Sequence, residues 1–145
     1  MGLIIDNSLS GKDHITAITS KVNKACYSIR LLKLFLPMDT LRMIYFSYAQ
    51  SVLSYGIIFR GNLHAHLTNS IFKIQKRIIR IITNSSSRDT CHHLFKQLRI
   101  LSLPSQYIFS LLVFVIKYRD FFQSNSEIHN LNTRFNHNLH YPIQT

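Results

Sequence analysis

The chain lacks several residues on which whole classes of protein depend. Its 145 residues include no tryptophan, two cysteines and only six acidic side chains. Cys26 and Cys91 lie far apart with no second pair, so a framework of disulfides is not indicated. Cys91 stands directly before His92 and His93, and no second Cys/His pair completes a tetrahedral zinc site. The sequence therefore predicts no metal site.

Long apolar runs are also missing. The longest lies around residues 107–116 and contains Ser110, whereas a bilayer span needs about 20 apolar residues. We therefore expect this run to form a buried helix, with no membrane insertion. No charged stretch precedes an apolar one at the N-terminus, which argues against a signal peptide. The predicted location is intracellular, in the nucleus or the cytoplasm, and not secreted.

Positive charge is what the chain has in excess. Seventeen Lys and Arg residues against six acidic ones give a formal net charge of +11. The partners that such a charge favours are polyanions, either nucleic acid or an anionic membrane surface. An apolar content of 46% and a length suited to one domain of ~100–200 residues allow a modest core. The composition thus indicates one small basic domain.

The hydrophobic periodicity predicts a mainly α protein, a small helical bundle of about five helices. A short strand over residues 3–6 precedes them, and the Asn-rich residues after Phe122 are expected to form a disordered C-terminal tail. The predicted helices span about residues 13–34, 40–59, 67–83, 90–97 and 104–122. The predicted divisions of the chain are residues 1–12, 13–83, 84–122 and 123–145.

Two of these helices have a predicted buried face. In the first, Asp13 is the expected N-cap, and the face consists of Ile15, Ile18, Val22, Ala25, Cys26 and Ile29. In the second, Asp39 is the expected cap, and the face consists of Leu41, Ile44, Tyr45, Tyr48, Val52 and Tyr55. This helical spacing makes the three tyrosines core residues rather than platforms on which nucleic-acid bases stack.

The third predicted helix carries the best candidate for a binding surface. At ~100° per residue, one arc of about 100° holds Ile71, Ile74, Ile78, Ile81 and Ile82. The opposite arc holds Lys73, Lys76, Arg77 and Arg80, and the first helix adds Lys21 and Lys24. An apolar stripe of this kind packs on a core. The cationic stripe either contacts phosphates or is simply a solvated surface.

Short sequence motifs along the chain, in their order and spacing, resemble those of one family. They are Leu36-Pro37, Thr40-Leu41 with Tyr45, Leu53-Ser54-Tyr55-Gly56, Gln75-Lys76-Arg77 and Arg80-Ile81-Ile82-Thr83. Gly2 with Asp6, Leu9-Ser10 with His14-Ile15, and the later run Leu98–Pro104 also match. The family is the reverse transcriptases of non-LTR retrotransposons, of the jockey-like kind. The resemblance is to the part downstream of the catalytic palm and spans about residues 1–122.

The resemblance implies a polymerase thumb, since the helices after the palm of such enzymes hold the template–primer duplex. It makes residues 13–83 thumb-like, residues 84–122 an additional helical segment, and residues 1–12 a remnant of the palm–thumb junction. The implied partners are an RNA/DNA duplex, bound through its phosphates by the basic helix faces, and the palm and fingers domains of the parent polymerase.

The catalytic centre of that family does not match any part of this chain. Its metal-binding carboxylates come from segments upstream of residue 1, and no two of the six acidic residues here are adjacent. We therefore expect part of an RNA-directed DNA polymerase that has no catalysis by itself and no cofactor, although the parent enzyme uses Mg²⁺. Two other classes stay open: a stand-alone basic helical module that binds nucleic acid, and a helical fragment that docks on another protein.

Overall fold

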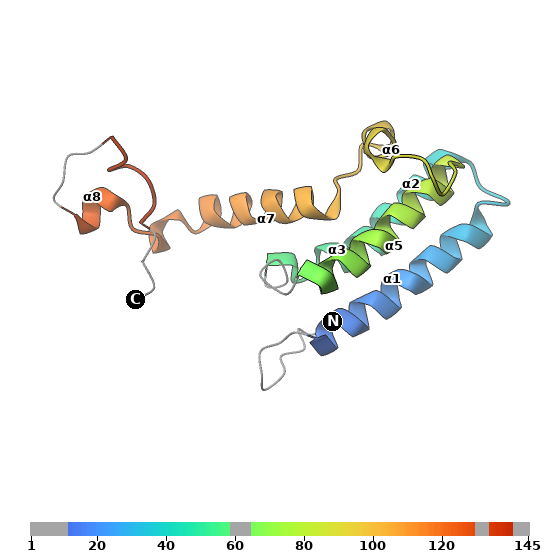
Figure 1. Ribbon diagram of the computed structural model, residues 1–145, viewed down its shortest axis with the longest axis horizontal. Coiled ribbons are helices and arrows are strands. Elements are labelled where there is room, and N and C mark those ends of the chain that lie inside the picture. Colours follow the sequence, from blue (N-terminus) through green and yellow to red (C-terminus); the bar gives the residue numbers. More distant parts are fainter. Residues whose placement is uncertain (1–11, 59–64, 130–133, 141–145) are drawn as a thin grey trace. The chain divides into compact units, whose positions relative to one another are not determined.

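The structure is a computed structural model that describes residues 12–58, 65–129 and 134–140 (Figure 1). It is mainly helical, at 74%, and these residues contain no strand, which confirms the predicted small helical bundle. The predicted N-terminal strand lies outside the described residues. The chain forms two compact units, Met1–Ile108 and Phe109–Thr145, and each is described by itself.

Helix α1, Lys12–Leu32, packs on the rest of the first unit with the face that its periodicity predicts. All six residues of that predicted face are buried. The helix ends at Leu32 rather than at the expected Leu34, and a turn leads from there to Pro37. Because α1 begins at Lys12, Asp13 lies in its first turn, and the prediction that Asp13 is the N-cap is wrong.

The second predicted helix is divided into three parts. They are α2, Met38–Ile44, a π-helical segment η1, Tyr45–Gln50, and α3, Ser51–Ser54. The expected cap at Asp39 is wrong, because Pro37 takes the N-cap position with an extended backbone and Asp39 lies in the first turn. The helix is interrupted before its expected end, because Tyr55 is extended and Gly56 has a φ of 63°, a conformation that glycine adopts without a steric penalty. The predicted end at Phe59 lies outside the described residues.

The π-helical segment changes which tyrosine side chains are buried. Tyr45 is fully buried as predicted, whereas Tyr48 is 38% exposed and Tyr55 is half-buried. A π-turn closes i→i+5 hydrogen bonds and so rotates the residues that follow it away from the α-helical register. Ala49 is consequently buried in the place where 3.6-residue periodicity favours Tyr48. The prediction that all three tyrosines are core residues is therefore right only for Tyr45.

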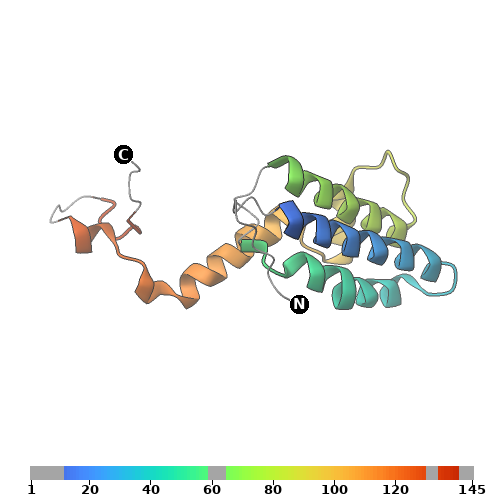
Figure 2. The same ribbon diagram turned by 90° about the horizontal axis from the view of Figure 1, so that it is seen from below.

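The remaining helices of the first unit follow in the predicted order. They are α5, Ala65–Thr83, α6, Cys91–Leu98, which Thr90 precedes as N-cap, and α7, which begins at Leu103 and ends at Lys117. Helices α1 and α5 and the stretch from α2 to α3 lie alongside one another, as Figure 2 shows from below, and α6 packs on α5. Their inward residues form one continuous apolar core.

Most of α7 is not the buried helix that its apolar sequence suggested. Only Leu103 and Gln106 are buried, and Ile108, Phe109, Leu112 and Ile116 are each more than half exposed. An apolar composition without a polar face shows that a helix favours burial, but it does not determine which surface covers that helix. The prediction of a buried helix over this run is wrong.

Gln75 of α5 is a fully buried polar residue at the centre of the first unit. Its amide nitrogen donates to the Tyr45 hydroxyl at 2.9 Å and to the Leu101 carbonyl oxygen at 3.1 Å. Its amide oxygen accepts from the Leu103 backbone N–H at 2.8 Å, and Tyr45 in turn donates to Gln50 at 2.9 Å. Because buried polar groups need partners, this amide fixes η1 and the start of α7 against α5.

The second unit contains the rest of α7, a short 3-10 helix, Arg119–Phe121, and the one-turn helix α8, Asn125–Ile128. Ser124 and Glu127 form a capping box at the start of α8, and an isolated antiparallel bridge joins Ser124 to Leu139. The described part of the predicted tail thus has local backbone order. A disordered tail in solution stays a prediction for this segment.

We expect Gln75→Leu to destabilise the protein by about 3 kcal/mol, although leucine fills a similar volume. The change leaves the buried Leu103 N–H and the part-buried Leu101 carbonyl without a side-chain partner, and an unpaired buried group costs ~1–3 kcal/mol. Urea denaturation followed by circular dichroism measures the difference. Gln97→Leu, at an exposed position of α6, is the matched control, with an expected change within about 0.5 kcal/mol. Equal stability of the two variants would show that the Gln75 bonds are dispensable.

Stability should also depend on pH through Tyr45. Burial raises the pKa of the Tyr45 hydroxyl to about 12, and the hydrogen bond from Gln75 lowers it in part. Since tyrosine in an unfolded chain has a pKa of about 10, the folded state favours the neutral hydroxyl. This stabilisation is complete below about pH 10 and is lost as the pH rises through about 12. In Tyr45→Phe, the tyrosinate absorbance step near pH 12 and the accompanying loss of stability should both be smaller; an unchanged titration curve would refute the assignment.

Candidate nucleic-acid interface

The core orients α5 so that its cationic stripe faces away from the buried side. The buried residues of the helix are Ile71, Ile74, Gln75, Ile78, Ile79 and Ile82. On the opposite arc, Lys73 and Arg77 are exposed, and Lys76 and Arg80 are half-buried. The sequence prediction differs at one isoleucine: Ile81 is only half-buried at the edge of the core, and Ile79 takes its place inside.

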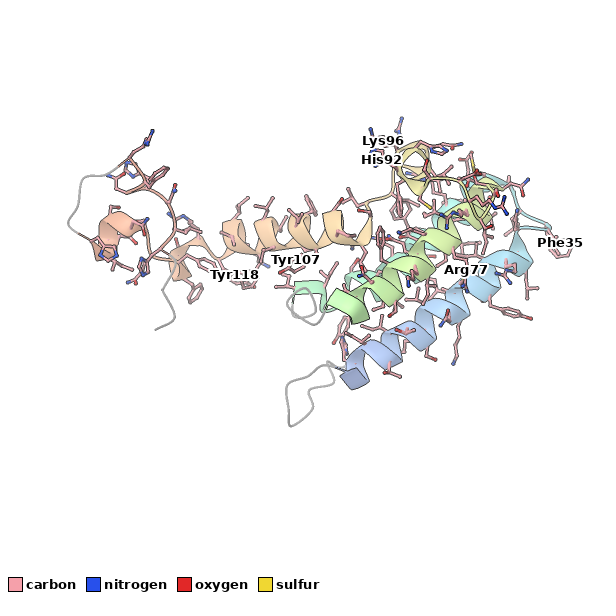
Figure 3. All side chains as sticks on the ribbon, viewed as in Figure 1. Phe35, Arg77, His92, Lys96, Tyr107 and Tyr118 are labelled. Carbon is pink, nitrogen blue, oxygen red and sulfur yellow. The ribbon has the colours of Figure 1, made fainter. Side chains whose placement is uncertain are left out.

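The cationic stripe forms one wall of an open groove with a volume of about 550 Å³. A serine-rich loop, with Ser85 and Ser87, follows α5 and lies on another side, and Ile81 also contributes. Five of the described lining residues are cationic and none is acidic: Lys33, Lys73, Lys76, Arg77 and Arg80. Figure 3 shows Arg77 on α5. An uninterrupted set of positive side chains beside hydroxyl groups favours a phosphate ligand, since both kinds of group donate hydrogen bonds to phosphate oxygens.

Two of the cations also hold the walls of the groove together. The Arg80 guanidinium donates through Nη2 to the Asp89 carbonyl oxygen at 2.9 Å, across the loop from α5 to α6. Lys33 Nζ donates to Asn84 Oδ1 at 2.6 Å. Lys33 comes from the turn after α1, so this bond joins that turn to the end of α5. The groove is therefore built from two stretches that are distant in the sequence, the turn after α1 and the end of α5 with the loop that follows it.

The other three cations of the groove are Lys73, Lys76 and Arg77, and they do not tie the walls of the groove together as Arg80 and Lys33 do. Lys76 Nζ lies 4.3 Å from the centroid of the Phe72 ring, a cation–π contact that leaves its outer side open. Lys73 and Arg77 are exposed. The charge of Arg77 also acts on α1: burial raises the pKa of the Cys26 thiol, and the positive charges of Arg77 and Arg30 lower it in part. These three residues are the best placed to meet an anion.

The two cations predicted on α1 are not part of this groove. Lys21 and Lys24 are exposed, but neither lines it, and Lys33 is the lysine that α1 and its turn contribute instead. Helical periodicity extended to Leu34 puts Lys33 on the apolar side of α1, together with Val22 and Ile29, which is why the sequence did not identify it. The end of the helix at Leu32 was the missing information.

The acidic and metal-capable residues are scattered across the part of the chain that the structure describes. No three His, Cys, Asp or Glu side chains gather there in a way that could hold a metal ion. Two of the carboxylates bond to backbone: Asp89 accepts from the Ser86 N–H, and Glu127 accepts from the Ser124 N–H, each at 2.7 Å. The absence of a cofactor from this chain stays a prediction.

Among the described residues, no single helix is long and apolar enough to cross a membrane. Helices α6 and α7, which meet at an angle of 52°, reach the required length and composition only when they are taken together. Residues Cys91, Leu94, Phe95 and Leu98 of α6 belong to the buried core of the first unit.

No family model, no curated protein and no solved structure matches the chain.

Proposed function

We propose that this chain is the thumb and following segment of an RNA-directed DNA polymerase of a non-LTR retrotransposon. In this proposal it holds a template–primer duplex by contacts between the α5 groove and the phosphates, and it performs no catalysis by itself. The observation that carries the proposal is the groove itself, in which five cations and two serine hydroxyls meet without an acidic residue among the described lining. Contacts of this kind position a duplex without reading its sequence.

The positions in the fold of the sequence motifs that resemble the family also support the proposal. Three separate motifs contain Tyr45, Gln75 and the run around Leu101. The hydrogen bonds of the Gln75 amide join all three. A fourth motif ends at Gly56, whose positive φ is a conformation that glycine adopts most easily. Short motifs that matched the family by chance would not be expected to contact one another through one set of hydrogen bonds. Their convergence favours one inherited structural unit.

Binding should therefore weaken with salt. The wild-type chain contacts about three to five phosphates in this proposal, so log Kd against log salt should have a slope of about 3 to 5. Lys73→Ala with Arg77→Ala removes two exposed cations and should flatten the slope by about 2, with no loss of helicity, because neither residue is in the core. Fluorescence anisotropy with an RNA/DNA duplex at low and moderate salt measures both slopes.

The matched control removes the same charge from α1. Lys21→Ala with Lys24→Ala should leave the slope nearly unchanged, because these lysines lie outside the groove. Equal flattening in the two double variants would mean that diffuse charge, and not the groove, binds the duplex. Binding of the wild-type chain to anionic lipid vesicles in preference to duplex would overturn the proposal in favour of a membrane surface.

A second candidate function is docking on another protein, which in the thumb interpretation includes the palm of the parent polymerase. The observation that favours it is a cluster of exposed apolar side chains at the end of α1 and in the turn after it. Leu34 and Phe35 are 76% and 82% exposed, and Phe35 projects from that turn in Figure 3. Tyr27, Leu31 and Met38 are exposed in the same stretch. Clustered apolar exposure of this kind marks interaction surfaces, whereas isolated exposed residues do not.

This apolar cluster should make the isolated chain self-associate as its concentration rises. Leu34→Asn with Phe35→Asn should lower the association measured by sedimentation velocity, because it removes apolar surface that contributes ~25 cal/mol per Å² when buried. Folding should be unaffected, since both side chains are exposed. A wild-type chain that stays monomeric at every concentration would count against a docking surface here.

A further inference from the structure

A second open groove lies on α6 and the segment that joins it to α7, and it has a volume of about 440 Å³. One wall is a row of three side chains at helical spacing, His92, Lys96 and Arg99. Ser102 and Ser105 also line the groove. None of the described residues that line this groove is acidic, and all of them belong to the first unit. Figure 3 shows His92 and Lys96 together on the outer side of α6.

The backbone at Arg99, where α6 ends, has a conformation that is uncommon for arginine. Arg99 ends α6 with a φ of 52° and a ψ of 44°, in the left-handed region. Helices commonly end in this conformation with glycine, because a side chain there is sterically costly. Arginine at such a position is unfavourable for the fold alone. The Ile100 N–H donates to the Phe95 carbonyl oxygen at 2.9 Å and closes the helix here, so the end of α6 fixes Arg99 in the lining of the groove.

A short stack of side chains connects the second groove to the first. Lys76, which lines the α5 groove, has its ammonium 4.3 Å from the centroid of the Phe72 ring. Phe72 in turn stacks on Phe95 with 6.3 Å between ring centroids, and Phe95 lines the second groove. One aromatic ring, that of Phe72, thus separates Lys76 of the first groove from Phe95 in the lining of the second.

We propose that the α6 groove binds phosphates of the same nucleic acid, as a second row of contacts beside the α5 groove. Lys96 and Arg99 supply the positive charge, and His92 and the serine hydroxyls supply further hydrogen-bond donors. A duplex carries one negative charge per ~1.7 Å of its axis, so a single duplex presents phosphates to both grooves. This inference rests on the proposed function and extends its site to Lys96 and Arg99, which the sequence did not single out.

The variant that tests it is Lys96→Ala with Arg99→Gly in the full chain. Both side chains are exposed, and glycine at position 99 accepts the positive φ without strain, so the melting temperature should stay the same or rise. The salt dependence of duplex binding should flatten by about 2, because two phosphate contacts are lost. Together with Lys73→Ala and Arg77→Ala, the flattening should be about 4, since the two grooves make separate contacts.

The outcomes separate this inference from the proposed function. If the α5 variant flattens the slope and the α6 variant does not, the α6 groove is not a phosphate site and only this inference is overturned. If only the α6 variant flattens it, the inference stands and the α5 groove is the wrong site. If the wild-type chain does not bind duplex at all, both are overturned. A fall in melting temperature for Arg99→Gly alone would show that the Arg99 side chain stabilises the fold, and it would count against a binding role for that side chain.

Discussion

The buried amide of Gln75 is the constraint on which the first unit depends. A glutamine without exposed surface is tolerable only because each of its polar atoms has a partner, one in η1 and two at the entry to α7. Apolar packing alone is compatible with several rotations of a helix, whereas hydrogen bonds accept few. The amide therefore selects the rotation of α5 about its own axis. That rotation places the cations of α5 on the side opposite the core.

The candidate interface follows from this geometry more than from charge alone. A chain with a net charge of +11 has basic residues on every face, and most of them need no explanation beyond solubility. What distinguishes the α5 groove is that α5 and the turn after α1 bring cations to one place. The bond from Lys33 to the Asn84 side chain and the bond from Arg80 to the Asp89 carbonyl oxygen hold the groove together. The interface is in this sense a product of the fold.

The sequence predicts best where one periodicity holds over many residues. The buried face of α1 and the two faces of α5 were predicted almost residue by residue, because an unbroken α-helix repeats every 3.6 residues. The errors lie where the backbone leaves that repeat. The π-turn exposes Tyr48, and the early end of α1 takes Lys33 out of the expected helical face. Arg99 has a conformation that its residue type does not signal. Nothing in the composition of α7 tells which surface would cover it.

The Gln75 bonds also constrain how the chain acquires its fold during synthesis. The partners of Gln75 are 30 residues before it and 26 and 28 residues after it. A ribosome therefore completes α1, α2 and α5 well before Leu101 and Leu103 emerge, and until then the amide lacks two of its three partners. The packing of α1, α2 and α5 is consequently completed late, and a shorter piece that ends with α5 would leave the Gln75 amide without two of its partners at the centre of the unit.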